Sequence, residues 1–307
     1  MVSVFSGKSD EEGARELISW FLPDKKPEGK SGDEDISGEQ GSGVEKVSGA
    51  GLVSVVNSND FLTLKGVKCF DHNGKVMEQY DELIVSKDVV RHATDKYEGK
   101  SLNKDINFTP YKAIAHFENQ KNGLFLPSFA LLSNVMLALY DQRDSGSDVK
   151  KVLDQFRDYG SGYGWHNSNT LVDWKDKKII HYPDDSDFPE CGGNEGINKG
   201  RQRREFGFDN KGFGDLVLED ALKKSGFRNY LIDLTGLKKP EVLCDVADYF
   251  GKPAMVWVPS NVEKADYSSG AWLGCSSNYF YLSAFIDLYS DIAARGVGAG
   301  GAKKRVK

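Results

Sequence analysis

Two histidines and one cysteine are the side chains in this chain that could be combined into a nucleophilic cysteine–histidine pair. His166 in "GYGWHNSN", His181 in "IIHYP" and Cys191 in "ECGGN" follow one another in the chain. A cysteine activated by a neighbouring histidine can act as a nucleophile. The spacing fixes no such pair, and histidines flanked by aromatic residues more often belong to a core or to a hydrogen-bond network.

An acidic stretch follows these histidines. The segment "PDDSDFPE", residues 183–190, places carboxylates close together, and carboxylate oxygens are the ligands that Ca²⁺ prefers. The segment lacks the glycine and the final glutamate of an EF-hand loop, so a solvated acidic turn is the favoured interpretation. The basic cluster "GRQRREFG", residues 200–207, is interpreted as ordinary surface charge.

These residues give one alternative hypothesis, a metal-assisted enzyme that uses His166, His181 and the acidic turn at Asp184–Asp187. No G-x-S-x-G, H-E-x-x-H or P-loop pattern is present in the sequence. No residue therefore argues for catalysis, and we predict a protein that is not an enzyme, with no catalytic residues, no metal ligands and no cofactor.

Tyrosine and serine dominate the stretch from Ala265 to Ala294. At the chain's average of 28% charged residues, these thirty positions should carry about eight charges, yet they carry only Asp266, Asp287 and Asp291. Tyrosine offers a large, rigid contact surface with a hydroxyl group, and serine and asparagine offer short, adaptable hydrogen bonds. This composition is typical of an antibody paratope and indicates a ligand-binding surface. The alternative is an aromatic edge strand with ordinary polar neighbours.

Apolar residues and glycines interrupt this stretch at intervals, and we interpret them as buried scaffold. Leu273, Leu282, Leu288 and Val297 are the expected invariant anchors, with Trp272 and Trp257 beneath the surface. The residues between them are expected to face outward and to bind the ligand: Tyr267, Ser268, Ser269, Ser276, Ser277, Asn278, Tyr279, Tyr281, Ser283, Phe285, Ile286, Asp287, Tyr289, Ser290, Asp291 and Ile292. The strongest contacts are expected from Tyr279, Tyr281, Phe285 and Tyr289, because aromatic residues dominate binding energetics. Leu282→Ala should lower the melting temperature, whereas Tyr281→Ala should hardly change it.

The amino acids of the stretch share a property at the codon level. Ser, Tyr, Asn, Asp, Ile and Phe can all be reached from an asparagine codon by changing only its two adenines. Lys, Glu, Gln and Met cannot, and all four are absent from residues 265–294. The region 265–298 therefore resembles the variable region of proteins diversified by diversity-generating retroelements, and its ending "AARGVG" is similar to the fixed "ARGVR"-like close of such regions, with glycine in place of the final arginine.

This resemblance implies an α+β chain with a C-type lectin fold of the formylglycine-generating-enzyme type over residues 101–307, with the variable residues on its exposed face. It also implies a protein or cell-surface partner and display on a virion or a cell, viral, bacterial or archaeal. The paired active-site cysteines of a true formylglycine-generating enzyme have no match. The triplets Glu-Pro-Asn and Gln-Pro-Asp of calcium-dependent lectins are also absent.

Composition excludes several other classes. The net charge of -6 argues against a dedicated nucleic-acid binder, and no run approaches the ~20 apolar residues of a membrane span. The N-terminus shows no signal peptide. The four cysteines lack metal-binding spacing and are expected to be free thiols. A structural virion or assembly protein, tethered by its basic tail and its flexible N-terminal linker, is a third hypothesis.

Several elements must position these residues. We expect an N-terminal helix within residues 1–22, a flexible linker or loop rich in glycine, serine and charge at 23–51, and a β-rich accessory segment at 52–100 with a hairpin turn at 72–75, "HNGK". Within 101–307, helices are predicted in "PSFALLSNVMLALYDQ", "SDVKKVLDQFRDYG", "FGDLVLEDALKKSG" and "KPEVLCDVADYFGKP". A hairpin is expected around Lys175–Lys178 and a buried strand in "AMVWVP".

Overall fold

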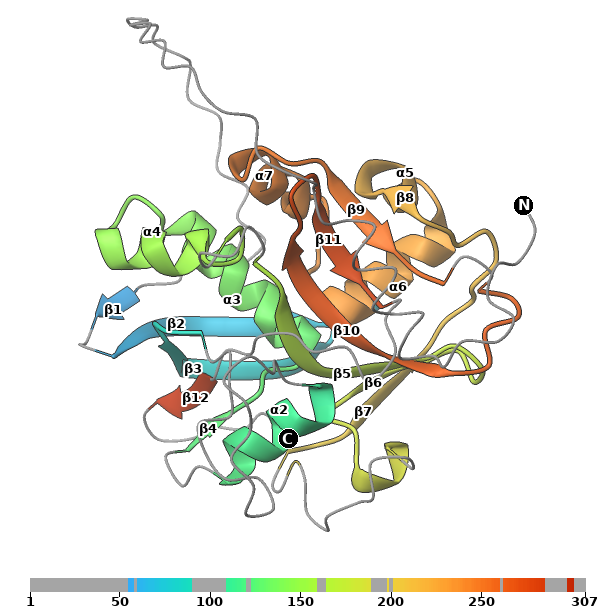
Figure 1. The fold of residues 1–307 in the computed structure, drawn as a ribbon, viewed down its shortest axis with the longest axis horizontal. Helices are drawn as coiled ribbons and strands as arrows, with labels where there is room; N and C mark the ends of the chain where they lie inside the picture. The colour runs from blue at the N-terminus through green and yellow to red at the C-terminus, as the bar shows by residue number, and fades with distance from the viewer. Residues whose placement is uncertain are drawn as a thin grey trace, which may run out of the picture. The chain divides into compact units, whose positions relative to one another are not determined.

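The computed structural model describes residues 55–57, 60–89, 109–119, 123–158, 164–188, 198, 201–259, 262–284 and 297–300. The predicted N-terminal helix and the predicted linker lie outside these residues. All described residues belong to one unit, Ser48–Lys307. Within the described part, two sheets and six α-helices confirm the α+β class (Figure 1).

The helices are α2 (Pro110–Asn119), α3 (Phe129–Asp141), α4 (Ser147–Asp154), α5 (Leu218–Leu222), α6 (Ser225–Thr235) and α7 (Val242–Tyr249), with a 3-10 turn η1 (Asp185–Asp187). The strands are β1 (Val55–Asn57), β2 (Phe61–Phe70), β3 (Val76–Ser86), β4 (Leu124–Phe125), β5 (His166–Asp173), β6 (Lys178–His181), β7 (Arg204–Gly207), β8 (Leu216–Val217), β9 (Ala254–Trp257), β10 (Ser268–Cys275), β11 (Phe280–Ser283) and β12 (Val297–Gly300).

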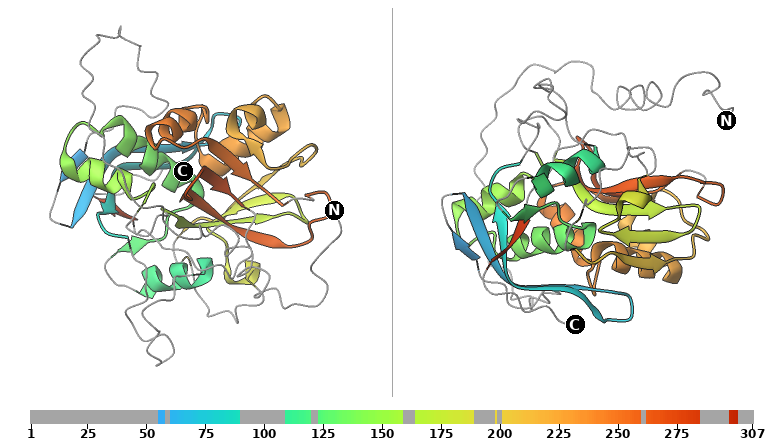
Figure 2. Two further views of the ribbon diagram at one scale, coloured as in Figure 1. Left: turned by 45° about the horizontal axis from the view of Figure 1, so that its top comes forward. Right: turned by 90° about the horizontal axis from the view of Figure 1, so that it is seen from below.

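The predicted hairpin at "HNGK" is confirmed as the β2–β3 pair, which forms a long two-stranded ribbon (Figure 2, right). The Asp71 carboxylate organises its turn by accepting hydrogen bonds from the backbone N–H groups of Asn73, at 3.0 Å, and Lys75, at 2.9 Å. Gly74 occupies the left-handed region at φ +76°, which glycine adopts without steric cost.

The first sheet has the strand order β1-β2-β3-β12-β4. β12 runs antiparallel to both of its neighbours, with Val297 opposite Val85 on β3 and Phe125 on β4. A strand that follows the tyrosine-rich stretch therefore lies inside the sheet built by the predicted accessory segment.

The second sheet has the strand order β7-β6-β5-β10-β11-β9-β8. The predicted hairpin around Lys175–Lys178 is confirmed as β5–β6. β10 and β11 form a second antiparallel hairpin, and β9 pairs with β11 in parallel. Ala254 and Val256 of β9 are buried while Met255 and Trp257 are half-exposed, so only one face of the predicted buried strand is in the core.

Helix α3 lies against both sheets (Figure 1). The Ser128 hydroxyl caps its start by accepting from the Leu131 N–H at 3.1 Å. Leu62 and Leu83 of the first sheet, and Leu273 and Leu282 of the second, belong to one hydrophobic cluster with this helix. Residues 61–86 therefore share a hydrophobic core with helix α3 and the second sheet.

Helix α2, which the sequence analysis did not identify, covers the opposite face of β5 and β6. Its Tyr111, Ile114 and Phe117 pack with Leu171 of β5 and Ile180 of β6 in a second, smaller cluster. Consequently β5 is buried on both faces, from His166 through Val172.

Two of the three remaining predicted helices differ in extent from expectation. α4 ends at Asp154, before the predicted end, and "FGDLVLEDALKKSG" contains strand β8, the short helix α5 and the start of α6. α7 matches the predicted helix, and Gly251 follows its end at φ +68° as expected.

Candidate functional site

The β10–β11 hairpin separates the tyrosine-rich stretch into a core side and an outer side. On the core side, Leu273 lies opposite Leu282 and Cys275 lies opposite Phe280, and all four side chains are fully buried. The expected anchoring roles of Leu273 and Leu282 agree with this burial. Leu288 and the side chain of Val297 lie outside the described residues.

The turn that joins β10 to β11 is organised by Ser276. Its hydroxyl oxygen accepts from the backbone N–H groups of Asn278 and Tyr279, both at 3.3 Å, and its own N–H donates to the Tyr279 carbonyl at 2.9 Å. Ser276 is therefore a buried residue that forms the turn, which corrects the expectation that it is exposed. Ser277, Asn278 and Tyr279 are exposed.

Tyr281 lies on the outer side of β11, within a group of aromatic rings. Its ring centroid is 5.3 Å from that of Trp257 on β9, 5.7 Å from that of Tyr279 and 6.2 Å from that of Trp272. Tyr281 and Trp257 are half-exposed, whereas Trp272 is buried. The prediction that Trp272 lies beneath the surface is confirmed; Trp257, in contrast, forms part of the surface.

Tyr267 and Ser268 lie at the opposite end of β10 from the turn. Tyr267 is 40% exposed and Ser268 is half-exposed. Because a strand rises by roughly 3.3 Å per residue, β10 separates them from Tyr279 by about 25 Å. The described candidate residues therefore form two groups and not one patch.

Ser269 and Ser283 are not exposed, which corrects the expectation for these two residues. Both are fully buried. The Ser269 hydroxyl accepts from the indole N–H of Trp174 at 2.9 Å and donates to the Ala284 carbonyl. It therefore satisfies polar groups inside the core. The remaining candidates lie outside the described residues: Phe285, Ile286, Asp287, Tyr289, Ser290, Asp291 and Ile292.

Two strands outside the tyrosine-rich stretch extend the outer side, and the sequence analysis missed their contribution. Tyr281 lies beside Met255 of β9, which in turn lies beside Val217 of β8. Val217 is 42% exposed. We call Val217, Met255, Trp257, Tyr279 and Tyr281 the outer aromatic surface. The alternation in "AMVW", with small or branched residues at 254 and 256, was the sequence signal that could have predicted an outward-facing Met255 and Trp257.

The two histidines of the alternative enzyme hypothesis are buried within β5 and β6. The His166 ring stacks on Phe156 with centroids 4.4 Å apart, and its Nδ1 lies 2.9 Å from the Gly164 carbonyl. His181 is opposite Thr170, four residues beyond His166 on β5, a separation of roughly 13 Å. The two histidine side chains are therefore too far apart to act in one reaction centre.

His181 is the middle of a buried hydrogen-bond chain. The Phe129 N–H donates to the Thr170 hydroxyl oxygen at 2.9 Å, and that hydroxyl lies 2.8 Å from Nδ1 of His181. Nε2 lies 2.9 Å from the Asp233 carbonyl, which can only accept, so Nε2 carries the proton. Burial lowers the pKa of His181 to about 4, so the ring is neutral at pH 7.

The acidic turn and the basic cluster, which the sequence analysis treated separately, meet in the structure. Arg203 contacts the Asp187 carboxylate with two nitrogens and lies 3.6 Å from Asp184. Among the described residues, no group of three His, Cys, Asp or Glu side chains is placed to hold a metal ion. Cys69, Cys244 and Cys275 are free thiols.

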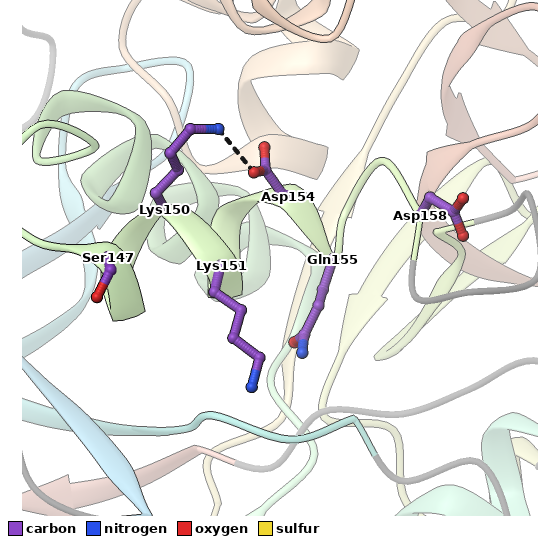
Figure 3. A pocket seen from close by; sticks show the side chains of 6 residues that line it. All are labelled: Ser147, Lys150, Lys151, Asp154, Gln155 and Asp158. Atoms are coloured by element: carbon purple, nitrogen blue, oxygen red, sulfur yellow. Dashed lines mark hydrogen bonds and ion pairs between the residues drawn. The ribbon is translucent and has the colours of Figure 1, made fainter.

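An open surface depression lies along α4 and not on the β10–β11 hairpin. It is lined by Ser147, Lys150, Lys151, Asp154, Gln155 and Asp158 (Figure 3). Lys150 is paired with Asp154 at 2.8 Å, and Lys151 and Gln155 point to the other side of the helix from Lys150. These polar groups do not converge on a single point, so the depression is the charged face of a surface helix.

No described helix is long and apolar enough to span a membrane. No protein-family model, curated protein or solved structure matches the chain.

Proposed function

We propose that this chain is a ligand-binding protein whose C-terminal surface is diversified by adenine-directed mutagenesis, as in diversity-generating retroelements. In this proposal the α+β unit is a C-type lectin-like fold with an N-terminal extension, and residues 265–298 are its variable region. The partner is a protein or a cell-surface component, and the chain performs no catalysis.

The observation that carries the proposal is the contrast in burial between neighbouring residues from Tyr279 to Leu282. Phe280 and Leu282 are fully buried, whereas Tyr279 and Tyr281 on either side of Phe280 belong to the outer aromatic surface. Substitutions at exposed positions usually change the free energy of unfolding by under ~0.5 kcal/mol, whereas truncations in the core cost several. A surface of this construction can therefore accept many residues while the fold stays intact.

The ends of the stretch give a second argument. Its first strand, β10, lies in the middle of the seven-stranded sheet, and the strand at its end, β12, lies inside the five-stranded sheet. Both flanks of the proposed variable region are therefore fixed by backbone hydrogen bonds. Backbone pairing depends little on side-chain identity, which suits a segment whose side chains change.

The proposal is tested first at the level of the gene. We expect a near-copy of the segment coding for residues 265–298 downstream of the gene, beside a reverse transcriptase, differing from it almost solely at adenines. A flanking sequence without such a repeat would refute diversification and leave the tyrosine-rich stretch as ordinary surface.

Binding is tested with a matched set of variants. Cells or particles that retain the wild-type protein should fail to retain Tyr279→Ala or Tyr281→Ala, while the melting temperature of Tyr279→Ala stays close to that of the wild type. Tyr140→Ala, which removes a half-exposed tyrosine at the end of α3, is the control and should bind normally. Equal loss of binding in all three variants would contradict the assignment of the surface.

A further inference from the structure

Asp215 lies beside the outer aromatic surface, although it is outside the tyrosine-rich stretch. It directly precedes β8, and its Oδ1 atom accepts a hydrogen bond from the backbone N–H of Val258, the residue after Trp257, at 3.1 Å. Burial raises the pKa of the Tyr281 hydroxyl, and the charge of Asp215 adds to this rise. Because Val217 lies opposite Met255 and Leu216 lies opposite Val256, the antiparallel register brings Asp215 beside Trp257, whose ring centroid is 5.3 Å from that of Tyr281.

Among the described residues, no lysine or arginine forms an ion pair with Asp215. Asp215 is an exposed residue, although partial burial of its carboxyl group raises the pKa of that group. At the turn that joins β10 to β11, the amino group of Lys252 donates to the Ser276 carbonyl. The Asp215 end of the outer aromatic surface thus carries a negative charge that no described cation neutralises.

The aromatic rings next to this carboxylate favour the same sign of ligand charge. The half-exposed indole of Trp257 lies 5.3 Å from the Tyr281 ring, with an angle of 34° between their planes. A cation over the face of tryptophan is attracted by the ring quadrupole. Arginine suits both features, because its planar guanidinium can stack on an indole while it donates hydrogen bonds to a carboxylate.

We propose that Asp215, Trp257 and Tyr281 form a subsite for an arginine side chain of the protein partner. The inference rests on the proposed function and deepens it. Asp215 and Trp257 lie outside residues 265–298, so this preference would stay constant while the neighbouring residues are diversified. The net charge of -6 would also favour encounter with a positively charged partner surface.

The test uses the full chain and two short peptides, acetyl-Gly-Gly-Arg-Gly-Gly-amide and its citrulline analogue, which has the same shape without the charge. The readout is the NMR resonance of the Trp257 indole N–H, assigned with Trp257→Phe. We expect saturable shifts with the arginine peptide and a Kd in the millimolar range, on the order of what one side-chain contact supplies. The citrulline peptide should give no saturable shift.

Asp215→Asn is the decisive variant, because its amide oxygen can still accept from the Val258 N–H. It should weaken binding of the arginine peptide about fivefold to tenfold. Asp144→Asn, which removes an exposed carboxylate in the turn after α3, has the same net charge and should leave the Kd within about twofold. Raising the ionic strength should weaken binding to the wild type.

Equal affinity for the citrulline peptide, or an unchanged Kd in Asp215→Asn, would overturn the subsite. The subsite would also be overturned if the wild-type chain bound phosphatidylcholine vesicles but showed no saturable shift with the arginine peptide. Failure here is distinguishable from failure of the proposed function, since the template repeat beside the gene is an independent observation. If the template repeat is found but the arginine peptide does not bind, only the subsite is rejected. If the arginine peptide binds but no template repeat is found, only diversification is rejected.

Discussion

The guanidinium of Arg203 contacts both carboxylate oxygens of Asp187, with Nε 2.9 Å from Oδ2 and Nη2 2.8 Å from Oδ1. This two-point contact ties the 3-10 turn after β6 to the start of β7. Both side chains are at most 30% exposed. The pair is therefore better shielded from solvent than most surface ion pairs.

Arg203→Lys should lower the free energy of unfolding by about 1 kcal/mol, because an ammonium cannot make two parallel hydrogen bonds to one carboxylate. A double-mutant cycle with Asp187→Asn should give a coupling energy of similar size. The control is the exposed pair of Lys223 and Asp220 on the surface of α5, for which we expect no measurable coupling. Urea unfolding measures both cycles, and similar coupling in the two pairs would contradict the prediction.

Gly236 should be the least replaceable glycine among those at positive φ that lie at helix ends or hairpin turns. It ends α6 at φ +65°, and an added Cβ would lie 2.9 Å from the Cβ atoms of Ala130 and Cys69. Gly74, at φ +76°, has no atom within 4 Å of an added Cβ. Gly74→Ala should cost about 1 kcal/mol of unfolding free energy for the left-handed backbone alone. Gly236→Ala should cost about 2–4 kcal/mol, because overpacking is added. Equal urea midpoints would contradict this difference.

Leu282→Ala and Tyr279→Ala should separate scaffold from surface. Leu282 is fully buried, and its truncation should cost about 2–5 kcal/mol. Tyr279 is 38% exposed at the turn, and its truncation should cost under about 1 kcal/mol. Tyr281→Ala, which the sequence suggested as the surface variant, is less suitable than Tyr279→Ala, because Tyr281 is half-buried among aromatic rings. Thermal unfolding measures both variants, and similar losses would show that the two sides of β11 are not distinct.

The buried neutral ring of His181 should make stability depend on pH. Its pKa is about 4 in the folded protein, against ~6.5 in an unfolded chain. Between these values the unfolded chain binds a proton that the folded chain does not. This contribution to the free energy of unfolding is therefore complete above pH ~6.5 and declines by about 3 kcal/mol as pH falls to 4.

The measurement compares the wild type with His181→Gln by urea unfolding from pH 7.5 to 4.5. Burial raises the pKa values of the Glu78 and Asp233 carboxyl groups, which favours the folded state at lower pH, but both proteins retain these groups. The difference between the two proteins should shrink as pH falls. A difference that does not change with pH would mean that His181 does not titrate as described.

Local patterns predicted the elements whose signals lie within a few residues. Gly74 and the neighbouring Asn73 were sufficient to place the β2–β3 turn. Helix α2 had a usable signal that was overlooked, since Pro110 at its first position follows Thr109, and Tyr111, Ile114 and Phe117 share helical spacing. α6 was hidden because Gly226 resembles a helix stop but lies in the first turn.

Long-range pairing could not be predicted in this way. The parallel alignment of Tyr281 with Met255, and hence the contribution of Val217, depends on register between strands that no local turn connects. The buried positions of Ser269 and Ser283 have the same origin. Composition distinguishes serine from leucine, but only the neighbouring strands decide which side of a strand is covered.

The place of β12 between β3 and β4 has a consequence for the order of folding. Val297 pairs with Val85 across about 200 residues of sequence. During synthesis, the edges of β3 and β4 that pair with β12 therefore stay unpaired until nearly all of the intervening chain has left the ribosome. Such distant closure slows folding and leaves strand edges open to aggregation. A translation product that stops before Val297 cannot complete its first sheet, so only chains that carry the whole tyrosine-rich stretch can reach the native state.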